Sequence, residues 1–224
     1  MHWTDLAALT SLREPERFED YRHQAAKSPQ YVDEAAEQGA QLEVSELFSR
    51  WQSSRDALAA TLEQADTTAR FPWFGPSMKA LSMVTARIME TWAHGQDVAN
   101  ALGAPWPATE ALKDIAHLGL ATREFTYRNN NIEPPSTPMY VELTGPQHQV
   151  WTWGDPTAEN SVKGSAWDFA LLVTQRAELS ELDLHITGED AATWASIAQA
   201  FAGAPKAVVR ARQARLADEN SATH

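Results

Sequence analysis

The 224-residue sequence predicts an α+β protein, with a helical bundle in the first part of the chain and a small α+β domain in the second. Two observations support this prediction. Up to about Asn130, apolar residues recur at intervals of three and four, which is typical of amphipathic helices. Beyond Pro134 and Pro135, apolar and polar residues alternate over short runs, which is typical of half-buried strands. We expect a helical domain at residues 1–130, a small α+β domain at 138–203 and a flexible tail at 204–224.

The first domain should be almost entirely helical after its first few residues. Helices are expected over residues 14–26, 29–38, 45–64, 77–102 and 109–128. Ser45 and Ser77 are residue types that favour helix N-termini, and Gly103 is one that ends helices. Because the links between the last three helices are short, we expect these helices to pack antiparallel in a bundle.

The second domain should combine short strands with two helices. Gly145 and Pro146 indicate a turn between the first two strands. The strands are expected over residues 139–143, 149–153, 162–164 and 182–187, and the helices over 165–174 and 189–201. Residues after Gly203 are rich in arginine, alanine and polar types, so they offer little apolar surface to bury.

Charge and cysteine content limit the classes of partner and chemistry. The formal net charge is −12, and no cluster of lysine and arginine could neutralise a run of phosphates. We therefore expect no nucleic-acid partner. The chain has no cysteine, which excludes thiolate metal sites and redox chemistry by its own thiols. No apolar run reaches the length of a membrane span, and the first residues do not resemble a signal peptide. We expect no membrane partner and a cytoplasmic location.

Glu90 and His94 form the most informative pair in the sequence. They lie four residues apart in a predicted helix, which places their side chains on one face with Cβ atoms roughly 5–6 Å apart. A carboxylate and an imidazole are both ligands of zinc and similar divalent metals. The alternative is a solvated polar face, because charged stripes on helices usually face water. Spacing alone leaves both interpretations open.

Other polar residues are candidates for the same site, each with a structural alternative. Asp97 could accept a hydrogen bond from His94 or could be solvated. Arg87 could bind a substrate carboxylate or could pair with Glu90 or Asp97. His117 lies on an apolar helix, where a hydrogen-bonded core histidine is the simpler interpretation, although the bundle could bring it to the site as a spare ligand.

Two segments of the first domain resemble a known family. The residues from Met89 to Ala99 (METWAHGQDVA) and those from Trp73 to Met78 (WFGPSM) resemble the metal-binding domain of the mycothiol-dependent maleylpyruvate isomerase family, within the DinB-like four-helix proteins. Segments 141–146, 151–154 and 168–176 resemble the C-terminal domain found in the same group. The resemblance covers about residues 1–203 and implies a DinB-like helical bundle for the first domain.

The resemblance also implies a metal site. In this family an E-x-x-x-H pair on one helix joins a histidine from an earlier helix to hold zinc or a similar divalent metal, and Glu90 and His94 match the pair. The family's earlier histidine comes shortly before a Trp-Thr-Asp segment, which here is Trp3 to Asp5. Its position would fall before the first residue, and His2 is the nearest substitute although it lies on a different helical face.

The family pattern therefore makes this chain resemble an N-terminally truncated member with an incomplete bundle. Either the true start lies upstream of Met1, or this form has an incomplete site. An incomplete bundle should leave an apolar groove along the helices at 45–64 and 77–102. We accordingly expect a homodimer or poor solubility.

The function implied is metal-assisted chemistry with a borrowed thiol. Because the chain has no cysteine, a small-molecule thiol such as mycothiol would be bound and activated, followed by isomerisation or transfer on a small-molecule substrate. The alternative is a non-catalytic, truncated relative that serves as a binding or oligomerisation module.

Overall fold

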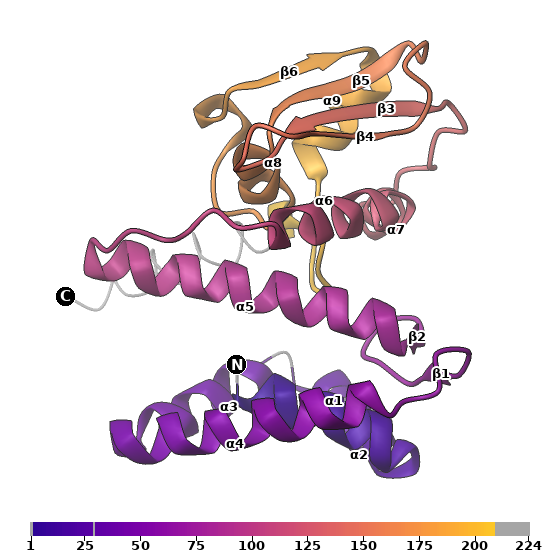
Figure 1. Ribbon diagram of the computed structural model, residues 1–224. Helices are drawn as coiled ribbons and strands as arrows, with labels where there is room; N and C mark the ends of the chain where they lie inside the picture. Colours follow the sequence, from indigo (N-terminus) through magenta and orange to yellow (C-terminus); the bar gives the residue numbers. More distant parts are fainter. Residues whose placement is uncertain (1, 29, 209–224) are drawn as a thin grey trace, which may run out of the picture. The chain divides into compact units, whose positions relative to one another are not determined.

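The computed structural model describes residues 2–28 and 30–208, which form two compact units (Figure 1). The division between the units lies between His94 and Gly95 and so falls within one long helix. From the sequence, a boundary between two domains is expected at about residue 130. That boundary stays a prediction. Of the tail expected at 204–224, residues 209–224 lie outside the described part of the chain.

Helices form most of the first unit. They are α1 (His2–Arg13), α2 (Pro15–Lys27), α3 (Tyr31–Ala40), α4 (Val44–Glu63) and the first part of α5 (Ala80–Leu102). Helix α1 packs against both α2 and α4. A small apolar core forms where Ala8 and Leu9 of α1 meet Leu58 of α4 and Met83 of α5. The anchoring of α1 at this core fixes the position of the Trp-Thr-Asp segment in its first turns.

Two expected helix caps are wrong. Helix α4 begins at Val44 with Glu43 as its N-cap residue and no side-chain cap hydrogen bond, so Ser45 lies inside the helix. Ser77 lies inside a two-stranded hairpin of β1 (Arg70–Phe71) and β2 (Met78–Lys79), directly before β2. Its hydroxyl accepts a hydrogen bond from Arg70 Nε at 3.0 Å. Helix α5 therefore begins at Ala80, directly after β2.

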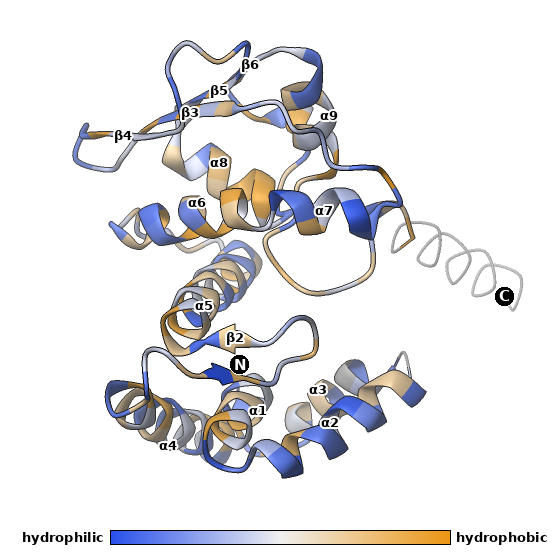
Figure 2. Cartoon of the chain, turned by 90° about the vertical axis from the view of Figure 1, so that its right-hand side faces the viewer, coloured by the Kyte–Doolittle hydropathy of each residue, from blue (hydrophilic) through white to orange (hydrophobic). Residues whose placement is uncertain are grey.

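In the second unit, the single helix expected over 109–128 is two helices. Helix α6 (Ala111–Ala121) and helix α7 (Arg123–Asn129) are separated at Thr122. The Thr122 hydroxyl donates to the backbone carbonyl groups of Leu118 and Gly119, in competition with the helical pattern. Figure 2 shows the apolar stretch of α6 in orange, and its residues Leu112 and Ile115 are buried.

A four-stranded sheet forms the centre of the second unit. Its strands are β3 (Met139–Thr144), β4 (Val150–Trp153), β5 (Asn160–Ser165) and β6 (Leu184–Thr187), in the order β4-β3-β5-β6. Strand β3 is antiparallel to β4 and parallel to β5, and β5 is antiparallel to β6. Helices α8 (Ala166–Val173) and α9 (Glu189–Ile197) pack against the sheet, and α6 packs against α8. The α+β fold class expected from the sequence is confirmed.

Candidate functional site

Glu90 and His94 lie together on helix α5, as the sequence predicts. Glu90 Oε2 and His94 Nε2 are 3.3 Å apart, and the two side chains are 26% and 50% exposed, respectively. The α5 backbone is helical from Ala80 to Leu102, which gives the i,i+4 pair its common face. Both donor atoms are therefore adjacent and reachable by a small molecule.

The donor separation fits two positions of a tetrahedral divalent metal. Zinc takes carboxylate oxygen and imidazole nitrogen at about 2.0–2.2 Å, so two tetrahedral ligands lie roughly 3.3–3.5 Å from each other. Across residues 2–28 and 30–208, however, no three side chains of histidine, aspartate or glutamate gather closely enough to share an ion. The separation of the pair fits two of the four ligand positions of a tetrahedral zinc site. Among the described residues, no third histidine, aspartate or glutamate joins the pair.

His2 and His117 are the two further candidate ligands. His2 Nδ1 lies 3.0 Å from Ser54 Oγ, which ties the start of α1 to α4. Burial is the main cause that lowers the pKa of His2, and the nearby charge of Arg50 adds to it. His117 is exposed on α6, so its interpretation as a core histidine is wrong. The structure gathers neither residue into a three-ligand group with the pair.

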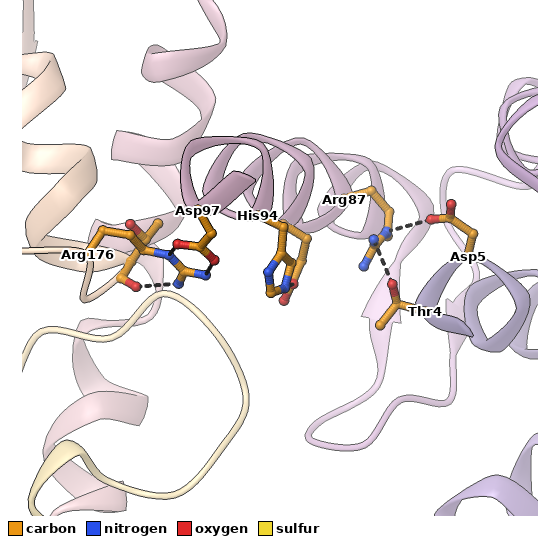
Figure 3. A network of polar contacts seen from close by, with 8 residues as sticks. Thr4, Asp5, Arg87, His94, Asp97 and Arg176 are labelled. Atoms are coloured by element: carbon orange, nitrogen blue, oxygen red, sulfur yellow. Dashed lines mark hydrogen bonds and ion pairs between the residues drawn. The ribbon is translucent and has the colours of Figure 1, made fainter. Parts of the chain in front are cut away.

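Arg87 is buried and paired rather than turned toward solvent. Its Nε lies 3.3 Å from Asp5 Oδ1, and its NH2 group donates to Thr4 Oγ1 at 2.9 Å. Figure 3 shows Thr4 and Asp5 of α1 facing this guanidinium group. Burial raises the pKa of the Asp5 carboxyl, whereas the charge of Arg87 opposes that shift. The Trp-Thr-Asp segment thus has a structural role in joining α1 to α5.

No pattern in the sequence pointed directly to this ion pair. Asp5 could be recognised only as an acidic residue in the first turn of a helix, a position that favours carboxylates in any helix. From the sequence, Glu90 and Asp97 are the predicted partners of Arg87. The structure shows Asp5, from helix α1, as a partner. The role of Arg87 in binding a substrate stays a prediction.

Asp97 forms a two-point ion pair within the second unit. Its carboxylate accepts from Arg176 Nε at 3.2 Å and from Arg176 NH2 at 2.8 Å (Figure 3). The same guanidinium donates to the carbonyl oxygen of Thr174, at the end of α8. The sequence did not identify Arg176 as the partner of Asp97. A role for Asp97 in orienting His94 stays a prediction.

Helix α5 carries both exposed and buried apolar side chains. Leu81, Val98 and Leu102 are exposed. The buried apolar side chains of this helix include Met83, Met89, Trp92, Ala93 and Ala99. None of the helices within residues 2–28 and 30–208 combines the length and apolar character that a bilayer crossing needs.

Comparison with known proteins identifies the first part of the chain. Residues 1–99 match the family described as the mycothiol maleylpyruvate isomerase N-terminal domain. The chain is 48% identical over 204 residues to the uncharacterized protein MT0041 of Mycobacterium tuberculosis (strain CDC 1551 / Oshkosh). It is equally similar to the uncharacterized protein Rv0036c of strain ATCC 25618 / H37Rv. Each match covers 91% of this chain and 79% of the relative. No solved structure matches the chain.

Proposed function

Because the chain belongs to the family of the mycothiol maleylpyruvate isomerase N-terminal domain, we propose that Glu90 and His94 bind a divalent metal, zinc in the first place, for thiol-dependent isomerisation or transfer on a small molecule. The observation that carries this proposal is the 3.3 Å separation of Glu90 Oε2 and His94 Nε2, which suits two ligands of one ion. Ligand positions beyond these two would be left for other donors, among them the substrate.

The composition of the pair suits the activation of a thiol. When bound, the metal would supply Lewis acidity and lower the pKa of a thiol or water that it coordinates. Glu90 contributes one negative charge and His94 none, so the ligand pair leaves net positive charge to favour a thiolate. The chain has no cysteine, and the thiol would therefore come from a small molecule, for which the family suggests mycothiol.

Metal analysis of the purified full chain tests the proposal. After loading with zinc and dialysis, the unaltered protein should keep about one ion per chain, and both Glu90→Ala and His94→Ala should lose it. Glu46→Ala is the matched control, because Glu46 also forms an exposed i,i+4 pair, with Arg50 at 2.6 Å. Retention of the ion in both site variants, or its absence from every version, would contradict the proposal.

The thiol is tested separately on cobalt-substituted protein. Adding mycothiol should produce thiolate-to-metal charge-transfer absorption, and the corresponding alcohol should not. His117→Ala and His2→Ala, taken in turn, show whether either histidine supplies a further ligand in solution. We expect both variants to keep the metal, because neither residue forms a three-ligand group with the pair.

One observation favours a second function, that of a non-catalytic binding or oligomerisation module. The described residues offer no group of three metal-ligating side chains, and two ligands hold zinc weakly. The same metal analysis distinguishes the two functions. A folded protein that holds no metal under any loading condition would favour the module.

A further inference from the structure

A pocket lies within the first unit, at helices α1, α2 and α3. It encloses about 490 Å³ and is lined chiefly by aromatic and charged side chains. Those that the argument uses are Trp3 from α1, Arg17, Asp20 and Tyr21 from α2, and Tyr31 and Glu34 from α3. None of them belongs to the Glu90 and His94 site, so this pocket requires its own explanation.

Three aromatic rings form inclined walls of the pocket. The rings of Trp3 and Tyr31 have centroids 5.8 Å apart and planes at 78°, and those of Trp3 and Tyr21 are 6.4 Å apart at 58°. All three side chains are partly buried, so they retain exposed surface. Rings that only fill a core pack without leaving a cavity beside them, whereas these rings line one.

Other aromatic rings hold two of these walls in place. Phe74 stacks on Trp3 with centroids 5.6 Å apart, and the fully buried Phe18 stacks on Tyr21 with centroids 6.2 Å apart. The walls therefore have support from the core and need little reorganisation when a ligand enters. Such preorganisation reduces the entropic cost of binding.

The charges at the pocket favour a cation. Asp20 and Glu34 are exposed carboxylates among the lining residues. Arg17 is the opposing charge, but its NH1 group lies 3.3 Å from Glu14 Oε2, which offsets it. The net charge of −12 on the whole chain adds a field that attracts cations.

We propose that the pocket formed by Trp3, Tyr21 and Tyr31, with Asp20 and Glu34 at its margin, binds an organic cation of the quaternary or methylated ammonium class. Such a cation is attracted to the faces of aromatic rings, and several inclined rings around one methylated nitrogen strengthen that attraction. The carboxylates supply the opposite charge. This inference is independent of the proposed metal chemistry, because the two sets of residues do not overlap.

Titration calorimetry of the full chain with choline tests the proposal against a matched neutral ligand. The compound 3,3-dimethylbutan-1-ol has the shape of choline without its charge. Choline should bind with a dissociation constant of the order of millimolar, and the neutral compound should bind at least roughly tenfold more weakly. Equal binding of the two compounds, or no binding of choline, would overturn the proposal.

Variants locate the binding. Tyr31→Leu should weaken choline binding roughly two- to thirtyfold, whereas Tyr31→Phe keeps the ring and should change it little. Asp20→Asn, at an exposed position, should also weaken it without disturbing the fold, and Arg17→Gln should strengthen it. Binding that is unchanged in both Tyr31→Leu and Asp20→Asn would place the cation elsewhere and refute the pocket. Glu90→Ala should leave choline binding unchanged, which separates this result from the metal test.

Discussion

Asp5 and Arg87 show how single side chains fix the helix that carries the Glu90 and His94 pair. Both are buried, and they join the first turns of α1 to α5. Taking two charges out of water is costly, and their attraction offsets that cost only while both partners are present. Burial raises the pKa of Asp5 even with Arg87 beside it, which indicates that desolvation is the larger effect.

Removing Arg87 should therefore be much more harmful than removing an exposed arginine. Arg87→Met leaves the buried Asp5 carboxylate without its partner and should lower the free energy of unfolding by about 3–5 kcal/mol at pH 7. Arg55→Met, which breaks an exposed pair with Asp56, should change it by less than about 0.5 kcal/mol. Urea unfolding of both variants measures the difference, and equal losses would contradict this account.

The sign of the pH dependence follows from the direction of the Asp5 shift. The pKa of Asp5 lies above its usual 3.8 in the folded state, so the unfolded chain loses this proton first as pH rises. The charge of Arg87 lowers this pKa, and Arg87→Met should raise it further. The loss of stability in Arg87→Met should accordingly shrink as the pH falls toward the raised pKa.

His2 should give the protein an acid-sensitive contribution to stability. Burial lowers its pKa below 6.5, so the unfolded state binds the proton first as pH falls through 6.5. Stability is then lost progressively between pH 6.5 and the folded-state pKa, and solvent screening at this partly exposed side chain keeps the loss small. His2→Asn should remove this part of the slope in urea unfolding between pH 8 and 5. At pH 8 the imidazole is neutral in both states, so any difference there measures only the contact with Ser54.

At the scale of elements, the structure departs from the sequence predictions where patterns are short or local. The hairpin of β1 and β2 has two residues in each strand, too few for an alternating pattern to be visible. The break at Thr122 depends on a hydroxyl that bonds to the preceding turn, which spacing cannot show. By contrast, the helix from Ala80 to Leu102 and the four strands of the second unit follow long or regular patterns and were predicted close to their observed bounds.

Gly95 in α5 is required by packing, although glycine has a low helix propensity. A Cβ atom at this position would overlap the indole ring of Trp106, so the helix surface must be bare there. Gly95→Ala should lower the free energy of unfolding by about 1–3 kcal/mol through overpacking, despite the better helix propensity of alanine. Gly39→Ala in α3 is the matched control, because no atom lies within 4 Å of its added Cβ.

The control should change stability in the opposite direction. Gly39→Ala should raise the free energy of unfolding by up to about 1 kcal/mol, because alanine loses less backbone entropy in a helix. Thermal and urea unfolding of the two variants measure the contrast. A Gly95→Ala protein as stable as Gly39→Ala would show that Trp106 moves aside without cost.

At the scale of the whole molecule, sequence reasoning predicted the placement of Glu90 and His94 better than the contacts around them. The spacing of Glu90 and His94 is local to one helix, and the structure keeps the pair together at 3.3 Å. The partners of Arg87 and Asp97 are distant in the sequence. Thr4 and Arg87 are separated by 83 positions, and Asp97 and Arg176 by 79. Spacing carries no information about such distant pairs, because only packing brings them together.

Self-association is the remaining expectation at this scale, and α4 provides the surface to test it. Val44 and Phe48 are 83% and 53% exposed and lie one helical turn apart on the same face. Large apolar side chains grouped on a surface favour association because contact removes them from water. We expect a homodimer whose interface includes this face.

The double variant Val44→Ser/Phe48→Ser should shift the protein toward monomer in sedimentation velocity at matched concentrations. Val150→Ser is the control, because Val150 is an exposed apolar residue on β4 and is not part of the predicted groove. The control should sediment as the unaltered protein does. If the unaltered protein sediments as a monomer, the exposed apolar side chains of α4 do not form a self-association surface, and the expected homodimer is wrong. A dimer that persists in the double variant would move the interface to another face of the chain.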